Sequence, residues 1–207
     1  MKFFLKKKIT IHKNHLNKKE KKEILLLIRK ENPDSILSNL SNEVLIKYLN
    51  LVIKSKFLSL FSLRIKNEII AYALVAKNPL YLISEISKIK FLILYDLIFR
   101  LRFLTIINLI LSFSRIDNLF INKNLSNLIK NSTNLNLLAV KCEFQSKGVG
   151  RYFLKEIFKK LKISKKNNIT CETYSNRAIK FYIKKFSFSV RGKKIRFFKP
   201  LKVLSLW

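Results

Sequence analysis

Gln145-Ser146-Lys147-Gly148-Val149-Gly150-Arg151 follows an apolar run at residues 135–140 and precedes a helical pattern at residues 152–158. Two of the three glycines in the chain lie within this stretch. Glycine is favoured where a backbone turns sharply or approaches another group very closely. The order of strand, glycine-containing turn and helix therefore predicts a loop shaped for a ligand, with a plain turn or helix cap as the alternative.

A loop of this kind presents several unpaired N–H groups at the positive end of a helix dipole, which is an arrangement suited to phosphate. Lys147 and Arg151 add positive side chains at the same place. The stretch lacks the third glycine of a dinucleotide-binding loop and the Gly-Lys-Ser/Thr ending of a nucleoside triphosphate loop. The sequence thus predicts a phosphate site of a different type.

A second motif, Ser175-Asn176-Arg177-Ala178-Ile179-Lys180-Phe181-Tyr182, follows a strand predicted at Ile169–Thr173. The loop resembles the Gln/Arg-x-x-Gly-x-Gly/Ala signature of the GNAT acyltransferase superfamily, with Gln145, Gly148 and Gly150 at the defined positions. The second motif resembles the Asn-x-x-Ala-x-x-Phe-Tyr helix of that superfamily. The resemblance covers residues 135–207 well and the first half of the chain loosely.

This resemblance implies acetyl-CoA, or another acyl-CoA, as the acyl donor and cosubstrate. It implies that the strand backbone at Ala139 and Val140 pairs with the pantetheine arm and that Tyr182 protonates the departing thiolate. The remaining donor-binding residues that it implies are those of the loop and of the second motif, namely Gln145, Lys147, Gly148, Val149, Gly150, Arg151 and Asn176. A phenol of pKa about 10 suits the acid role, because a free thiol is only ~1.5 units more acidic. The alternative is that Phe181 and Tyr182 only pack the helix on the sheet.

The sequence departs from the family pattern in three places. Ser175 stands where the family has asparagine, and Asn176 comes one position later. Residues 184–188 lack the glycine that usually follows Phe-Tyr. The strand before the loop carries asparagines at positions 134 and 136, so no general base is assigned there. Glu172 could take a proton or orient a water, but we expect it to point to solvent and pair with a lysine.

The composition points to one domain covering residues 1–207, since 49% hydrophobic residues exclude general disorder. The formal net charge is +31, but only nine of the 43 basic residues are arginine and the lysines are spread along the chain. A nucleic-acid surface uses more arginine, so we expect no nucleic-acid partner. The lysine excess is the residue usage of an AT-rich genome, and it also suits the phosphates of CoA.

The cysteines and histidines predict neither a disulfide nor a metal site. Cys142 and Cys171 are expected to be small apolar residues on the two strands that flank the site. His12 and His15 are expected to face solvent. The apolar segment at residues 3–5 is followed at once by three lysines and is too short for export, so a cytoplasmic location is expected.

The first half predicts a strand within residues 2–13, a helix at Lys18–Lys30, a helix capped at Ser41, and a hairpin of Leu58–Ile65 with Ile69–Ala76. Together with the resemblance, this gives an α/β (α+β) fold: a GNAT-like mixed, mostly antiparallel central sheet flanked by helices.

Residues 80–132 form an extra helical insertion of two or three predicted helices. Its longest uncharged stretch, Phe103–Ser114, is far shorter than the ~20 residues that cross a bilayer. The insertion is expected to pack on the sheet or on a second subunit, or to contact a membrane surface peripherally through residues 84–115. It resembles an insertion expected in GNAT-like members of sugar-nucleotide and polysaccharide pathways.

The predicted function is transfer of an acetyl or other acyl group from acyl-CoA to a primary amine by direct attack. The acceptor expected from the resemblance is an amino sugar or a sugar nucleotide. One alternative is a non-catalytic module of degenerate GNAT fold that binds acyl-CoA or a membrane surface. A basic nucleic-acid-binding protein is the third possibility and is supported by charge alone.

Overall fold

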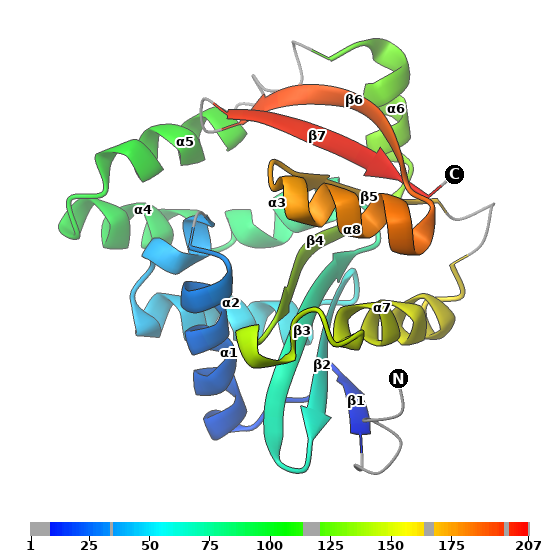
Figure 1. The fold of residues 1–207 in the computed structure, drawn as a ribbon. Coiled ribbons are helices and arrows are strands. Elements are labelled where there is room, and N and C mark those ends of the chain that lie inside the picture. The colour runs from blue at the N-terminus through cyan, green and yellow to red at the C-terminus, as the bar shows by residue number, and fades with distance from the viewer. Residues whose placement is uncertain (1–8, 34, 114–120, 164–167, 197–198, 207) are drawn as a thin grey trace.

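The computed structural model describes residues 9–33, 35–113, 121–163, 168–196 and 199–206. Its strands form one seven-stranded sheet in the order β1-β2-β3-β4-β5-β7-β6 (Figure 1). All neighbouring strands are antiparallel except β4 and β5, so the predicted mixed, mostly antiparallel sheet is confirmed. The strands are β1 (Ile9–Lys13), β2 (Leu58–Ile65), β3 (Glu68–Ala76), β4 (Thr133–Val140), β5 (Ile169–Thr173), β6 (Ser189–Arg196) and β7 (Lys199–Ser205).

Helices cover both faces of this sheet. Helices α1 (Lys18–Glu31) and α2 (Asn42–Lys54) pack on one face in a cluster with Leu58, Leu60 and Leu74 of the central hairpin. Helices α7 (Val149–Lys160) and α8 (Asn176–Phe186) pack on the other face. Because successive strand residues point to opposite faces, the apolar strands β2 and β3 supply both layers of the core.

The N-terminal elements agree with the prediction and have clear local causes. Asn17 caps α1 in a reciprocal capping box with Glu20, and Ser41 caps α2 as predicted. A short 3-10 helix, η1 (Ile36–Asn39), links them. Strand β1 begins at Ile9, and residues 2–8 of the predicted strand lie outside the described part of the chain.

The insertion contains four described helices, which is more than the two or three predicted. They are α3 (Pro79–Ser87), α4 (Lys90–Phe99), α5 (Phe103–Phe113) and α6 (Lys123–Lys130). Helices α4 and α5 form a hairpin that extends to one side of the sheet in Figure 1. Among the described helices, none has the length and apolarity that crossing a membrane requires.

Two features of the second half differ from the sequence expectation. The β6–β7 hairpin was not predicted, and β7 inserts between β5 and β6. Cys142 is exposed in a 3-10 turn, η3 (Cys142–Phe144), and not on a strand, because β4 ends at Val140. Cys171 is buried on β5 as predicted.

Buried tyrosines make the fold sensitive to alkaline pH. Burial raises the pKa of Tyr48 and Tyr72 well above the ordinary value. The folded chain keeps these phenols protonated, while the unfolded chain loses the protons above about pH 10. Stability is therefore fully present below about pH 10 and falls as the pH rises above it, by up to ~1.4 kcal/mol per pH unit for each such tyrosine.

This loss is measurable as a falling thermal midpoint between about pH 9 and pH 11. Tyr48→Phe removes one buried titrating group, so the decline should become shallower. Tyr81→Phe is the matched control because Tyr81 is exposed. Equal declines in the wild type and in Tyr48→Phe would contradict the prediction.

Candidate active site

Strands β4 and β5 pair for only part of their length. The parallel pairing runs from Thr133 opposite Ile169 to Leu135 opposite Cys171, and the strands diverge beyond it (Figure 1). At the next residue, the β3–β4 register shifts by one, which leaves Asn136 as the extra residue of a β-bulge. A bulge bends and twists its strand. The two strands therefore separate where pairing with β5 stops and β4 bends. The space between them is here called the β4–β5 opening.

The end of β4 turns backbone groups toward this opening. The Lys141 N–H donates to the Ile70 carbonyl, and Val140 lies opposite Ala71. In an antiparallel pair, every second residue directs its backbone N–H and C=O groups to the partner strand, and the residues between direct theirs away from it. The N–H and C=O groups of Val140 and Leu138 therefore face away from β3. The backbone of Ala139 faces Tyr72 on β3. The backbone groups of Ala139 are therefore used in pairing with β3, whereas those of Leu138 and Val140 point away from β3.

The loop after β4 ends in a row of available N–H groups. Within the described chain, Tyr152 N–H donates to the Gly148 carbonyl and no acceptor is found for the N–H groups of residues 146–151. The Gln145 N–H donates to the Cys142 carbonyl, so the free donors begin at Ser146 and not at Gln145. Successive free amides at a helix N-terminus are suited to an anion, and Lys147 and Arg151 lie exposed beside them.

The two glycines of the loop have different roles. Gly148 is the N-cap of α7 with φ 83°, and a Cβ built on it would meet no atom within 4 Å. It thus has the left-handed backbone that favours glycine and open space in front of it. A Cβ on Gly150 would approach Phe181 at 3.4 Å and Val140 at 3.6 Å. Gly150 therefore lets α7 pack closely, and the side chain of Val149 is buried in the same core.

Glu31, at the end of α1, makes hydrogen bonds to the loop. It was not predicted as a site residue. Its carboxylate accepts from the Cys142 N–H at 3.1 Å and from Gln145 Nε2 at 2.8 Å. Gln145 Nε2 also donates to the Val140 carbonyl at 2.7 Å. Gln145 is thus turned inward and braces the loop between α1 and β4. No local sequence signal could reveal this contact, because 114 positions separate Glu31 from Gln145.

We predict that Glu31→Gln weakens CoA binding. The substituted amide keeps one acceptor oxygen and turns an NH2 group toward a donor, so one of the two loop contacts to a charged carboxylate is lost. Such a loss costs ~1–3 kcal/mol, which corresponds to a roughly fivefold to hundredfold weaker affinity in calorimetry. Glu43→Gln on α2 changes an exposed carboxylate and should leave the affinity unchanged. Equal affinities in both variants would contradict a bracing role for Glu31.

Tyr182, on α8, lies beside the β4–β5 opening. Its ring packs against Phe181 and Phe188, and the residue lines a cavity of about 620 Å³. The structure gives its hydroxyl no hydrogen-bond partner among the described residues. Burial, and secondarily the nearby Cys171 thiol, raise the pKa of Tyr182 well above 10. The phenol therefore remains protonated throughout the physiological pH range.

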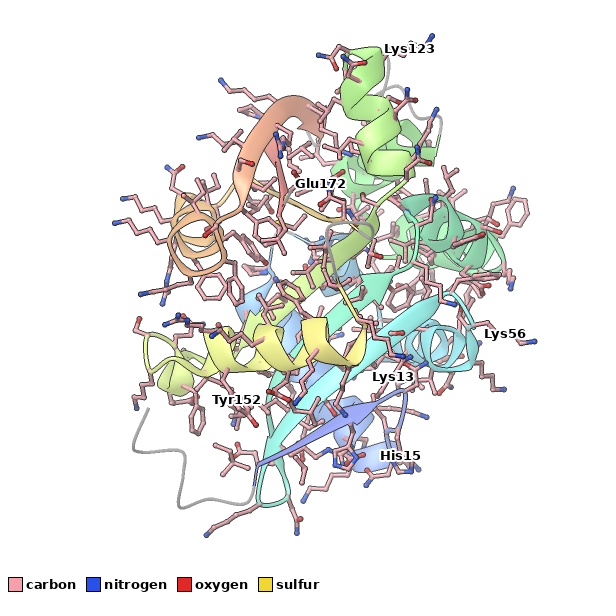
Figure 2. All side chains as sticks on the ribbon, turned by 90° about the vertical axis from the view of Figure 1, so that its right-hand side faces the viewer. Lys13, His15, Lys56, Lys123, Tyr152 and Glu172 are labelled. Carbon is pink, nitrogen blue, oxygen red and sulfur yellow. The ribbon has the colours of Figure 1, made fainter. Side chains whose placement is uncertain are left out.

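The cavity extends from the β4–β5 opening toward the insertion. Its two acidic lining residues within the described chain are Glu31 and Glu172. Glu172 does pair with a lysine, Lys194, at 2.6 Å, but only 12% of the Glu172 side chain is exposed. The expectation that Glu172 points to solvent is therefore wrong, because it is largely buried in an ion pair with Lys194 of the unpredicted strand β6. Figure 2 shows it in the upper part of the molecule, below Lys123 of α6.

The second motif caps α8 and contributes a cation. Ser175 is the N-cap and its hydroxyl accepts from the Ala178 N–H, so serine performs the capping that asparagine could perform. Asn176 is the exposed first residue of the helix. Arg177 Nη2 lies 3.5 Å from Ser146 Oγ, which places a guanidinium over the loop. Arg177 was not predicted, although it stands within the motif.

Comparison with solved structures identifies the architecture. An acetyltransferase assigned to the GNAT family from Desulfovibrio desulfuricans superposes with a TM-score of 0.57 at 10% identity, over 96% of this chain and 97% of that one. The fold is that of the GNAT acetyltransferases. PaiA N-acetyltransferase from Thermoplasma acidophilum, solved in complex with coenzyme A, matches with a TM-score of 0.51 at 11% identity, over 96% and 98% of the two chains.

The ribosomal-protein-S18-alanine N-acetyltransferase of Escherichia coli shares the same GNAT fold, with a TM-score of 0.53 at 10% identity over 96% of this chain and 92% of that one. The sequence itself matches no family model and no curated protein. The likeness therefore lies in the arrangement of the elements.

Proposed function

We propose that this protein is a GNAT-type N-acyltransferase that moves an acetyl or other acyl group from acyl-CoA to a primary amine. The observation that carries the proposal is the row of free amides at residues 146–151 beside the β4–β5 opening. That row suits the pyrophosphate of CoA, with Lys147, Arg151 and Arg177 as cations around it. The outward N–H and C=O groups of Leu138 then suit the amides of the pantetheine arm.

In this proposal the reaction is a direct displacement at the thioester carbonyl. The amine nitrogen forms a bond to the carbonyl carbon, the carbon–sulfur bond breaks, and the thiolate takes the proton of the Tyr182 hydroxyl. The acylated nitrogen then loses a proton, which passes through water to the Tyr182 oxygen and restores the phenol. The Val140 N–H points to the side where the developing oxyanion can accept it. The ammonium loses its proton through water in the cavity. Holding the two substrates together accounts for most of the rate enhancement.

The raised pKa of Tyr182 is compatible with this role. A phenol harder to ionise is a weaker acid, but a thiolate in the same buried opening is also a stronger base. Burial raises the pKa of the neighbouring Cys171 thiol in the same way. Both partners of the proton transfer therefore shift in the same direction, and the transfer stays closely balanced.

The acceptor that we propose is an amino sugar or an amino-sugar nucleotide. The net charge of +31 attracts anionic molecules, and a nucleotide carries phosphates. A polyamine would be repelled by the same field. Glu172 and Lys194 supply a polar end to the cavity, on which hydroxyl groups could bind. The supply of acyl-CoA in the cytoplasm suits the same assignment.

The test is thiol release from acetyl-CoA with a panel of amines, together with calorimetry of CoA binding. We expect micromolar to millimolar binding of CoA and turnover with an anionic amino sugar. Binding of CoA without turnover on any amine would favour the non-catalytic module. Turnover only with apolar amines would overturn the proposed acceptor but retain the transferase. Failure to bind CoA would overturn the whole proposal.

A further inference from the structure

The α4–α5 hairpin exposes large apolar side chains over its outer surface, although its inner side already packs on the core. Ile93, Leu97 and Leu109 are buried in the cluster formed with α1 and α2. The outward residues include Phe91 at 75% exposed and Leu104 at 72% exposed. The full set, here called the outer apolar face, is Phe91, Tyr95, Ile98, Phe99, Leu101, Phe103, Leu104, Ile107 and Ile110.

A helix that is apolar on all sides is normally enclosed by protein or lipid. Scattered exposed leucines are ordinary, but here nine large exposed apolar residues gather on one two-helix hairpin. Helix α5 carries no charged residue between Phe103 and Phe113. The hairpin extends away from the sheet, so no other described element covers its outer side (Figure 1).

The tip of the hairpin supports the same conclusion. Leu101 joins the two helices with φ 53°, a left-handed conformation that a branched side chain adopts at a cost. Glycine or asparagine would fit this turn with less strain. The chain instead places leucine there, 71% exposed, between Phe99 at 79% and Phe103 at 61%. Three large apolar groups thus project together at the tip.

The charges around this face are positive. Lys88, Lys90, Arg100 and Arg102 flank the ends of α4 and the tip, and Lys90 Nζ lies 4.9 Å from the Phe91 ring centre. The acidic residues of α3 and α4, Glu85 and Asp96, are both engaged with the protein. Glu85 is buried beside Lys88, and Asp96 accepts from the Ser41 N–H. The face is therefore apolar in the middle and cationic at its rim.

We propose that this hairpin docks on the surface of a bilayer that contains anionic lipids. The outer apolar face enters the interface between headgroups and acyl chains, and the rim cations contact the lipid phosphates. A second copy of this chain fits the outer apolar face less well than an anionic bilayer does. In a symmetric dimer the cations at the rims of the two copies would lie close together and repel each other. Docking is independent of acyl transfer, and it would hold the neighbouring cavity close to the membrane surface.

The experiment is sedimentation of the full chain with vesicles of phosphatidylcholine alone and of phosphatidylcholine with phosphatidylglycerol. We expect binding to the anionic vesicles that weakens with added salt. Lys90→Gln with Arg102→Gln should weaken it by about fivefold per charge. Phe99→Ser with Leu101→Gly should weaken it by at least about tenfold for each apolar group removed.

Two controls separate docking from misfolding and from self-association. Leu101→Gly relieves the strain of the left-handed backbone at position 101. The thermal midpoint of this variant should therefore not fall, whereas its affinity for vesicles should fall. Leu26→Ser removes an equally exposed leucine, 66% exposed on α1, and should leave binding unchanged. Absence of binding to anionic vesicles would overturn the proposal. So would a dimer in sedimentation without vesicles that Phe99→Ser with Leu101→Gly dissociates.

Discussion

Gly148→Asp is expected to abolish measurable CoA binding. The side chain would enter the open space in front of the loop amides, where a phosphate would bind. Two unit charges about 5 Å apart repel by ~3 kcal/mol at an effective dielectric constant of about 20. With each phosphate carrying charge, the affinity should fall by at least about a hundredfold. Isothermal calorimetry with CoA measures this directly.

Gly148→Asn is the matched control for that variant. Asparagine has nearly the same size as aspartate, tolerates the left-handed conformation at φ 83° and carries no charge. We expect its CoA affinity to remain within about fivefold of the wild type, since the strain cost is small. Equal loss in both variants would mean that backbone strain, and not phosphate repulsion, explains the effect. If Gly148→Asp bound CoA with the affinity of the wild type, the proposal that the loop binds the CoA phosphates would be wrong.

Tyr182→Phe is expected to lower turnover by at least about tenfold with little change in CoA affinity. The substitution removes only the hydroxyl that lines the cavity and keeps the packing with Phe181 and Phe188. A structural role alone would instead lower the thermal midpoint and leave turnover unchanged. Tyr152→Phe is the control, because Tyr152, labelled on α7 in Figure 2, is 42% exposed.

The pH dependence gives a second readout for Tyr182. Its raised pKa keeps the phenol protonated, so its ionisation should cause no fall in the wild-type rate below about pH 10. The rate should rise with pH as the acceptor ammonium loses its proton. Tyr182→Phe should retain that rise at a lower absolute rate. A wild-type rate that declines near neutral pH, with no such decline in Tyr182→Phe, would contradict the raised pKa.

Local sequence signals predicted the elements whose patterns are short in range. The helix cap at Ser41 and the strand pattern of Leu58–Ile65 act within a few residues. The predicted positions of α2 and of the β2–β3 hairpin therefore agree with the structure. The glycines at 148 and 150 likewise predicted the strand–loop–helix order of the site. The β6–β7 hairpin was missed, because its lysine-rich strands lack clear apolar alternation and gain their place from pairing with β5.

By itself the sequence determined a GNAT-like order of elements, the glycine-containing loop between β4 and α7, and a tyrosine on the later helix α8. These depend on residue types at fixed short spacings, which local backbone preferences enforce. Only the tertiary structure decided that Glu31 braces the loop, that Lys194 pairs with Glu172, and that no described element covers the outer apolar face. Such contacts join residues far apart in the chain, and their energies exist only once the sheet has brought those residues together.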